Sequence, residues 1–430
     1  MCMFLDAWLM KVKKLNILLQ WPIDMLKVAK REMRLVFADI GVVIFFFVLC
    51  GVYPLLYSLI YDAEVVRDVR VTVIDNCRSQ ETRELVRHLD ATPEIAVVSY
   101  SANMEEAKRQ LHEKQVYGIV SIPREFSKCV GRGEQANLDV YCDMSVMLRY
   151  KNMLLAVTNV TQDLAARSQA AAVAPVIYNT GSIVESRQIP IGNTAMGIAS
   201  AILLFILPLV VQQSMVLGIG MLHGGSFERR VHNLGYDPRE VPAGVIPTVL
   251  GKTVCYLLMY VVPIIYVLHY TPMFFSFPQH ATLWNVLMLA VPFALSVAFM
   301  GQALMFLIRE RESVFLFLAF TSVIFVFLSG VSWPRFQMST LWQTVGACLP
   351  STWMSNAYAL VQSDGASLAD VAHHVRMLWL LTGGYFVLAC VTEGLVLRPY
   401  YRNMQARAAI DPTALYKGEA ERNGVDIVSD

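Results

Sequence analysis

Few residues of this chain have types and spacing that could do chemistry, and none is arranged for catalysis. Gly251, Lys252 and Thr253 spell the end of a phosphate-binding loop. The full motif needs another glycine five positions before Gly251, and Ile246 stands there. No Ser/His/Asp set or pair of carboxylates can be argued from the sequence either. We therefore expect neither a nucleotide site nor a catalytic site in this chain.

The histidines and cysteines do not predict a metal site. His373 and His374 adjoin, but neighbouring residues on a helix point in different directions. The cysteines form no CxxC pair. Cys129 and Cys142 could form a disulfide, or they and Cys77 could all be unpaired thiols. We expect no metal and no cofactor in this chain.

Two ionisable residues within apolar stretches could serve an ion-coupled carrier, which needs buried acids or bases to hold its coupling ion. They are Lys252 and Glu393. Both fall near expected ends of membrane helices, where a long side chain can reach water. We therefore interpret Lys252 as an anchor and Glu393 as a snorkelling acid. Energy for uphill transport would then come from a partner.

Two basic segments are candidates for contact with such a partner. Residues 22–39 place Leu26, Ala29, Met33 and Val36 on one face of a helix, which predicts an in-plane amphipathic helix. The opposite face carries the cations Lys27, Lys30, Arg31 and Arg34. The alternative for this segment is a simple basic flank of a membrane span.

The second segment is the loop 223–244, in which 226–233 could form a short helix. Its exposed charges would be Glu228, Arg229 and Arg230. They could dock on another protein, or the loop could be a solvated connection. Our candidate coupling residues are Lys27, Arg31, Arg34, Glu228, Arg229 and Arg230.

Long stretches without charge indicate the elements that position these residues. Hydrophobic residues make up 56% of the chain and charged residues 16%, against about 25% charged in soluble domains. A helix needs roughly 20 apolar residues to cross the hydrocarbon core. We expect an integral membrane protein with spans at about 41–60, 194–221, 245–269, 283–308, 313–331 and 375–397.

The distribution of basic residues predicts the orientation. Asp24 and Glu32 are the acids of a window before the first span in which cations dominate, so the N-terminus is expected in the cytoplasm. These cations are Lys11, Lys13, Lys14, Lys27, Lys30, Arg31 and Arg34. Six spans also place the C-terminus there. The opening is too long and polar for a cleaved signal, so we expect the first span to be retained.

Residues 62–190 have a different character, because β-branched runs alternate with helical periods. Such alternation predicts a small sheet covered by helices, here outside the membrane. The expected fold is an α-helical polytopic membrane protein with six transmembrane helices and an inserted extracytoplasmic α/β domain. The expected parts are an arm (1–40), the first span (41–61), the α/β domain (62–190), the remaining spans (191–400) and a cytoplasmic tail (401–430).

Several short motifs occur in an order that resembles the ABC type-2 transporter permeases, in the subgroup with a large periplasmic domain between the first two spans. They are VTVIDNCRS (71–79), YGIVSIPREF (117–126), GK (251–252), LSGVSWP (328–334) and LPST (349–352). The resemblance to multidrug and polymer exporters covers roughly residues 25–400. It implies a re-entrant segment at about 334–360, with Gly330, Pro334, Pro350 and Thr352 as candidate residues. Glu228 occupies the coupling position, but the family's usual ExxxGT is absent.

The resemblance implies an export permease in the bacterial inner membrane that lacks its own ATPase. Its partners would be a cytoplasmic ABC ATPase dimer holding ATP and Mg²⁺, a second identical or related permease chain, the lipid bilayer and a periplasmic adaptor. Nucleic acid is not an expected partner. The uncharged spans favour a hydrophobic or amphiphilic cargo. The alternative is a membrane-anchored receptor or envelope assembly platform that transports nothing.

Overall fold

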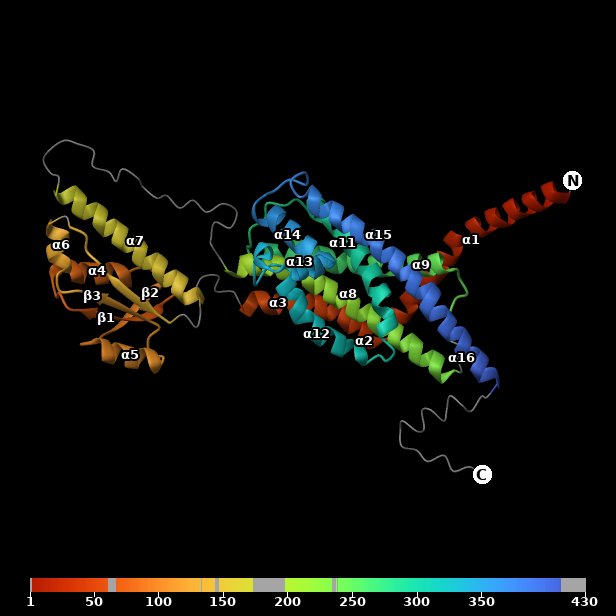
Figure 1. Ribbon diagram of the computed structural model, residues 1–430, viewed down its shortest axis with the longest axis horizontal. Coiled ribbons are helices and arrows are strands. Elements are labelled where there is room, and N and C mark those ends of the chain that lie inside the picture. The colour runs from red at the N-terminus through yellow and green to blue at the C-terminus, as the bar shows by residue number, and fades with distance from the viewer. Residues whose placement is uncertain are drawn as a thin grey trace, which may run out of the picture. The chain divides into compact units, whose positions relative to one another are not determined.

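The computed structural model describes residues 2–60, 67–132, 134–143, 147–172, 198–233, 237 and 239–410. The chain divides into two compact units. Figure 1 shows the chain coloured by residue number, from red at the N-terminus to blue at the C-terminus. The first comprises Met1–Asp62 and Pro190–Asp430, and the second comprises Ala63–Ile189. Each unit has its own hydrophobic core.

The first unit begins with a long helix that is broken before the first span. Helix α1 (Cys2–Ala38) ends at Asp39, whose backbone is extended. The Asp39 carboxylate accepts hydrogen bonds from the backbone N–H groups of Gly41 (3.0 Å) and Val42 (3.3 Å) and so caps the next helix. That helix runs through α2 (Ile40–Val43), a π-helical stretch η1 (Ile44–Leu49) and α3 (Cys50–Ile60). Asp39 therefore separates α1 from the apolar helix after it.

The remainder of the first unit is also helical. Its longer helices are α8 (Ile198–His232), α9 (Val245–Ile265), α11 (Leu283–Leu304), α12 (Ser313–Leu328), α14 (Pro350–Ser363), α15 (Ala372–Val391) and α16 (Arg398–Ile410). Its short helical pieces are η2 (Tyr266–Tyr270), α10 (Thr271–Phe274), η3 (Met305–Leu307), η4 (Arg335–Gln337), α13 (Thr340–Ala347) and η5 (Thr392–Leu397).

Within the described residues, five helices are long and apolar enough to cross a membrane, so the chain is a multi-pass membrane protein. They are Ile40–Ile60, Ser200–His232, Val245–Phe274, Leu283–Leu304 and Ala372–Ala406. The expected sixth span coincides with α12, which has 16 residues. Its length is about 24 Å, against a hydrocarbon core about 30 Å thick. The sixth crossing stays a prediction.

Aromatic rings and small residues form the core of the helical unit. The ring of Phe46 packs edge-on against Tyr260, with 5.1 Å between centroids, and it lies directly on Gly218 of α8. A Cβ atom at Gly218 would overlap the Phe46 ring, so this contact needs glycine. The Tyr260 hydroxyl donates to Ser214 Oγ at 3.1 Å. Small residues permit such close approach between membrane helices.

The segment expected to be re-entrant contains η4, α13 and the first part of α14. Gly330 has a φ of +95°, which favours glycine, and it lies just after α12 ends. Pro334 directly precedes η4, and Pro350 is the first residue of α14. Thr352 is buried within α14. Their re-entry into the outer leaflet stays a prediction.

The second unit is a four-stranded sheet with strand order β2-β1-β3-β4. Strand β1 (Val69–Asp75) is parallel to β2 (Ile95–Tyr100) and β3 (Gly118–Ile122), whereas β4 (Asp139–Cys142) is antiparallel to β3. Its helices are α4 (Gln80–Asp90), α5 (Met104–His112), α6 (Phe126–Arg132) and α7 (Met147–Ala172). The core combines residues of β1, β3, α4 and α7, namely Val71, Val73, Leu85, Val120 and Met153.

The three cysteines of this unit are free thiols in the structure. A hydrogen bond with Ser127 holds the pKa of the Cys77 thiol below its ordinary value. Burial raises the pKa of the Cys142 thiol.

Candidate functional site

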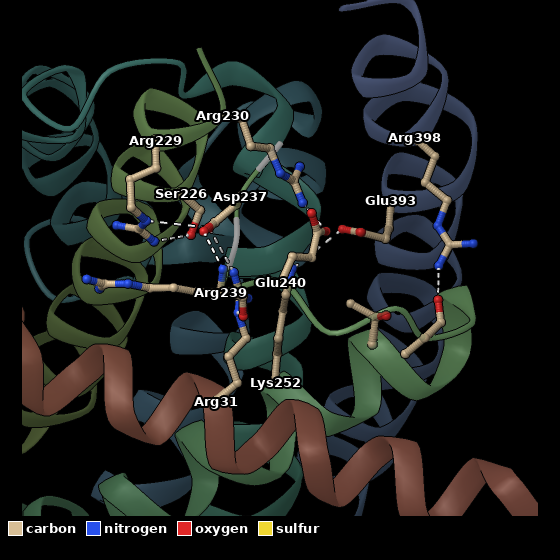
Figure 2. Close-up of polar contacts among 12 residues, drawn as sticks. Arg31, Ser226, Arg229, Arg230, Asp237, Arg239, Glu240, Lys252, Glu393 and Arg398 are labelled. Atoms are coloured by element: carbon tan, nitrogen blue, oxygen red, sulfur yellow. Dashed lines mark hydrogen bonds and ion pairs between the residues drawn. The ribbon is translucent and has the colours of Figure 1, made fainter. Parts of the chain in front are cut away.

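One end of the helical unit gathers charged side chains from segments that are far apart in the sequence. Figure 2 shows them converging from α1, the end of α8, the following segment, α9 and η5 with α16. We name this cluster the charged junction. Its members are Arg31, Arg229, Arg230, Asp237, Arg239, Glu240, Lys252, Glu393 and Arg398.

Helix α8 reaches this junction because it is much longer than a membrane span requires. It has 35 residues, which corresponds to about 52 Å. The structure differs here from the sequence prediction of a loop from 223 and a separate helix at 226–233. One continuous helix runs through His232 and carries Glu228, Arg229 and Arg230 on its last turns.

Asp237 connects its own segment to α1 and to α8. Its side chain is fully buried (0% exposed), and its Oδ2 lies 3.2 Å from Arg31 Nη2 of α1 and 3.4 Å from Arg229 Nε of α8. Its Oδ1 accepts the backbone N–H of Arg239 at 3.0 Å. Arg31 Nε also donates to the backbone oxygen of Arg239 at 2.8 Å. Helices α1 and α8 are therefore both held to the segment around Asp237.

Arg230 is buried, contrary to its expected exposure on a docking helix. Its side chain is 8% exposed, pairs with Glu240 and lies over the ring of Tyr401, 3.4 Å from the centroid. A guanidinium over an aromatic face is stabilised electrostatically. Arg230 therefore joins α8 to α16 and is not available to another protein in this conformation.

Glu228 is exposed, as predicted, but its carboxylate already has a partner. Its Oε1 accepts the backbone N–H of Arg311 at 2.7 Å. The Arg311 side chain in turn pairs with Asp39, the residue at the break between α1 and α2. Gly224 packs against the Arg311 backbone, and a Cβ atom there would lie 2.9 Å from Arg311 Cα. The end of α8 is thus connected to the turn before α12 and to the break at Asp39.

Lys252 and Glu393 form an ion pair with each other. Their Nζ and Oε2 atoms are 3.6 Å apart, and their side chains are 17% and 13% exposed. Glu393, interpreted from the sequence as a snorkelling acid, thus has Lys252 as its partner, and its snorkelling stays a prediction. Because the two charges compensate each other, neither is left single among the spans. The pair joins α9 to η5.

Gly251 brings α9 close to α1. A Cβ atom at Gly251 would lie 2.6 Å from the backbone oxygen of Met25 and 2.8 Å from Val28 Cβ. The buried face of α1 includes Val28, Ala29 and Val36, whereas Leu26 is 62% exposed. The predicted apolar face was therefore wrong at Leu26, because α9 meets α1 on another side.

A small polar cavity of about 40 Å³ lies within the junction. Three buried atoms of its lining residues have no hydrogen-bond partner among the described residues: Glu32 Oε2, His223 Nε2 and Arg230 Nε. A polar cavity of this size can hold water, which satisfies such atoms. The ion pairs of the junction therefore surround a hydratable space.

Three further cations of α1 lie outside the junction, in a groove of about 600 Å³ that we name the basic groove. They are Lys27, Lys30 and Arg34, and Lys27 pairs with Asp24 at 3.6 Å. The lining residues are Lys27, Lys30, Arg31, Arg34, Leu35, Ala38, Arg239 and Val241. Of the candidate coupling residues, the structure thus brings Arg31, Arg229 and Arg230 together and places Lys27 and Arg34 beside them.

A metal site requires an arrangement of several ligand side chains around one ion. In the part of the chain that the structure describes, no three His, Cys, Asp or Glu residues are placed to hold a metal ion. The rings of His373 and His374 both pack edge-on against Trp353. The ion pairs of the junction connect α1, α8, α9 and η5.

The sequence prediction missed Asp237, Glu240 and Tyr401. Asp237 lies 206 positions from Arg31, and no spacing rule relates them. The sequence feature that could have indicated them is the presence of two acids, Asp237 and Glu240, close to the arginines of residues 229–240. Such mixing indicates local charge pairing, but it does not identify the partners.

A comparison with known protein families gives one match. A family model described as "ABC-2 family transporter protein" matches residues 40–391, which is most of the chain. No curated protein and no solved structure gives a significant match.

Proposed function

The chain belongs to the ABC-2 family of transporter proteins, and we propose that it is the permease subunit of an ATP-driven exporter. Membership makes the chain a membrane transport component and not itself an enzyme. It also implies association with an ABC ATPase and with the membrane.

The pairing of intramembrane charges supports an external source of energy. A carrier driven by an ion gradient needs buried ionisable groups that bind the coupling ion during the cycle. Lys252 and Glu393 are the charged residues within the apolar stretches that could have this role, and they form an ion pair with each other. ATP hydrolysis in separate subunits is the source that the family provides.

The single observation that carries the proposal is the position of Asp237 between α1 and α8. A force applied to the segment around Asp237 acts on α1 through Arg31 and on α8 through Arg229. The Glu228 contact with Arg311 extends this connection toward α12. An ATPase that closes beneath the charged junction would therefore move these helices as rigid bodies.

The rest of the proposed assembly follows the family resemblance. Two permease chains, identical or related, enclose a path at their interface, and two ATPase subunits bind ATP and Mg²⁺ on the cytoplasmic side. Both termini and the charged junction face the cytoplasm of a bacterial cell. The second unit faces the periplasm, where an adaptor protein could contact it. The cargo is hydrophobic or amphiphilic.

The receptor or assembly platform is not favoured, because the family match covers the helical unit as well as residues 63–189. A platform would need its spans only as an anchor.

The test begins with the full chain, purified in detergent from its native membrane. We expect a stoichiometric ABC ATPase to accompany it, and we expect vesicles that contain the complex to transport only with ATP. If vesicles with this chain alone accumulate solute on a proton or sodium gradient, the proposal is wrong.

The coupling step is tested in the reconstituted complex with Arg229→Glu, which places a carboxylate beside Asp237. We expect cargo-stimulated ATP hydrolysis to be lost while basal hydrolysis persists. Arg402→Glu is the matched control, because Arg402 is an exposed arginine of α16 outside the junction. Equal stimulation in the two variants would exclude this route of coupling.

A further inference from the structure

We propose that the basic groove binds the phosphate headgroup of an anionic phospholipid. This inference depends only on the chain being a membrane protein and not on the proposed ATPase partner. It concerns Lys30 and Arg34, which take no part in the charged junction.

The positive charge of the groove is only partly compensated by described acids. Its lining, as far as the structure describes it, includes no aspartate or glutamate. Lys27 has Asp24 and Arg31 has Asp237, but Lys30 and Arg34 form no ion pair with any described acid. Lys30 and Arg34 are four residues apart on α1, where like charges repel and destabilise a helix. An anion between them would remove this repulsion and accept charge-assisted hydrogen bonds.

The exposed side of α1 has the pattern of a helix that lies at a membrane interface. Ile23, Leu26 and Phe37 are 53%, 62% and 61% exposed. Together with Lys30 and Arg34 they recur at intervals of three, four, four and three residues, so all five share one face of the helix. Apolar side chains beside cations insert into the boundary between headgroups and acyl chains.

The shape of the groove favours a lipid over a free anion. A volume of about 600 Å³ is far larger than a phosphate ion needs and lies within the range of small-molecule sites. Leu35, Ala38 and Val241 add an apolar wall to the cationic one. A phospholipid has both parts, because its phosphate meets the cations and its glycerol and first methylenes meet the apolar wall. An acidic protein surface would leave the exposed Ile23, Leu26 and Phe37 in water.

The test measures lipid bound to the full chain in neutral detergent by native mass spectrometry. The chain is titrated with phosphatidylglycerol and, separately, with phosphatidylcholine of the same acyl chains. We expect phosphatidylglycerol to bind more tightly. Each cation near the lipid surface contributes about 1 kcal/mol, so Lys30→Gln/Arg34→Gln should weaken phosphatidylglycerol binding about 30-fold.

The matched control is Arg309→Gln/Arg402→Gln, which removes two exposed cations of the same unit outside the groove. We expect this variant to bind phosphatidylglycerol as the wild type does. Arg34→Lys keeps the charge and should retain most of the affinity. Lys30 and Arg34 are exposed, so we expect unchanged folding, and an unchanged thermal midpoint checks this.

Four results would overturn the proposal. The first is equal affinity for the two lipids. The second is an equal effect of the two double substitutions: the groove variant and the control variant lose phosphatidylglycerol binding to the same extent, or neither variant loses any. The third is inorganic phosphate displacing phosphatidylglycerol at equal concentration, which would identify a general anion site. If the groove variant loses its ATPase partner and keeps its lipid, the groove is a protein-docking surface and the proposal is likewise wrong.

Discussion

At the scale of single residues, Asp237 determines whether the charged junction holds. A buried carboxylate is expensive to desolvate, and here two guanidinium groups and a backbone N–H compensate that cost. Such an arrangement contributes little net stability when it is intact. Removal of one member, however, leaves the other charges without compensation. Asp237 is therefore a position where a small chemical change has a large local effect.

We predict that Asp237→Asn weakens the junction by about 3 kcal/mol, because Arg31 and Arg229 lose their shared counter-charge. The release should be local, so the measurement is the rate of tryptic cleavage after Arg239, which rises. Asp370→Asn serves as the control. Asp370 is an exposed acid that accepts hydrogen bonds only from Ser367 among the described contacts. Equal cleavage rates in the two variants would contradict the role given to Asp237.

At the scale of elements, the contact of α1 with α9 sets the geometry of the junction. Gly251 allows the backbone of α9 to approach Met25 and Val28 of α1 closely. Lys252 of α9 and Arg31 of α1, which pair with Glu393 and Asp237, lie on these two helices. The close approach of the two helices at this point therefore requires glycine.

We predict that Gly251→Ala forces α1 away from α9, because its Cβ would lie 2.6 Å from the Met25 oxygen. The expected destabilisation is about 1–3 kcal/mol, as for other overpacked interiors. A lower thermal midpoint of the purified chain measures it. Gly383→Ala in α15 is the control, because nothing lies within 4 Å of a Cβ atom there. It should keep or slightly raise the midpoint, since alanine favours a helix.

The helices and strands could be predicted from the sequence wherever periodicity or lack of charge is strong. The β-branched run 69–75 is β1, and the charge-free stretch 41–60 is the helix from α2 to α3. The end of α8 could not be predicted, because Gly224 and Gly225 followed by charged residues resemble a loop. Contacts with Arg311 and Tyr401, distant in the sequence, support that part of the helix.

The candidate site could be predicted in part. The sequence identified Arg31, Arg229 and Arg230 from their charge and their place beside spans. It did not identify their partners, because an ion pair depends on tertiary packing and not on spacing along one helix. The exposure of Leu26 could not be predicted for the same reason. The position of α9 determines which face of α1 is buried, and that position depends on tertiary packing.

At the scale of the whole molecule, the chain combines two units, each with its own hydrophobic core. The helical unit carries apolar residues on its outside, such as Leu316 and Phe320 of α12, which suits lipid. Residues 63–189 instead form a small sheet with a separate buried core. That core includes Met153 of α7, which is fully buried and lies against Gly118 of β3.

We predict that residues 63–189, produced alone, fold in water with one cooperative unfolding transition. Met153→Ala should lower the free energy of unfolding by about 2–5 kcal/mol, because it leaves a cavity between α7 and the sheet. Chemical denaturation followed by circular dichroism measures both results. Leu154→Ala is the control, since Leu154 is a neighbouring exposed residue of α7. A broad, non-cooperative transition would show that the unit needs the rest of the chain.

The length of α12 has a consequence for the lipid around the protein. If this helix of 16 residues crosses the bilayer, it falls about 6 Å short of the hydrocarbon thickness. Hydrophobic mismatch of this kind is relieved by a locally thinner bilayer or by flanking side chains that reach toward the headgroups. The bilayer would then be thinner beside the permease. A lipid-like molecule would have a shorter distance to travel from one leaflet to the other.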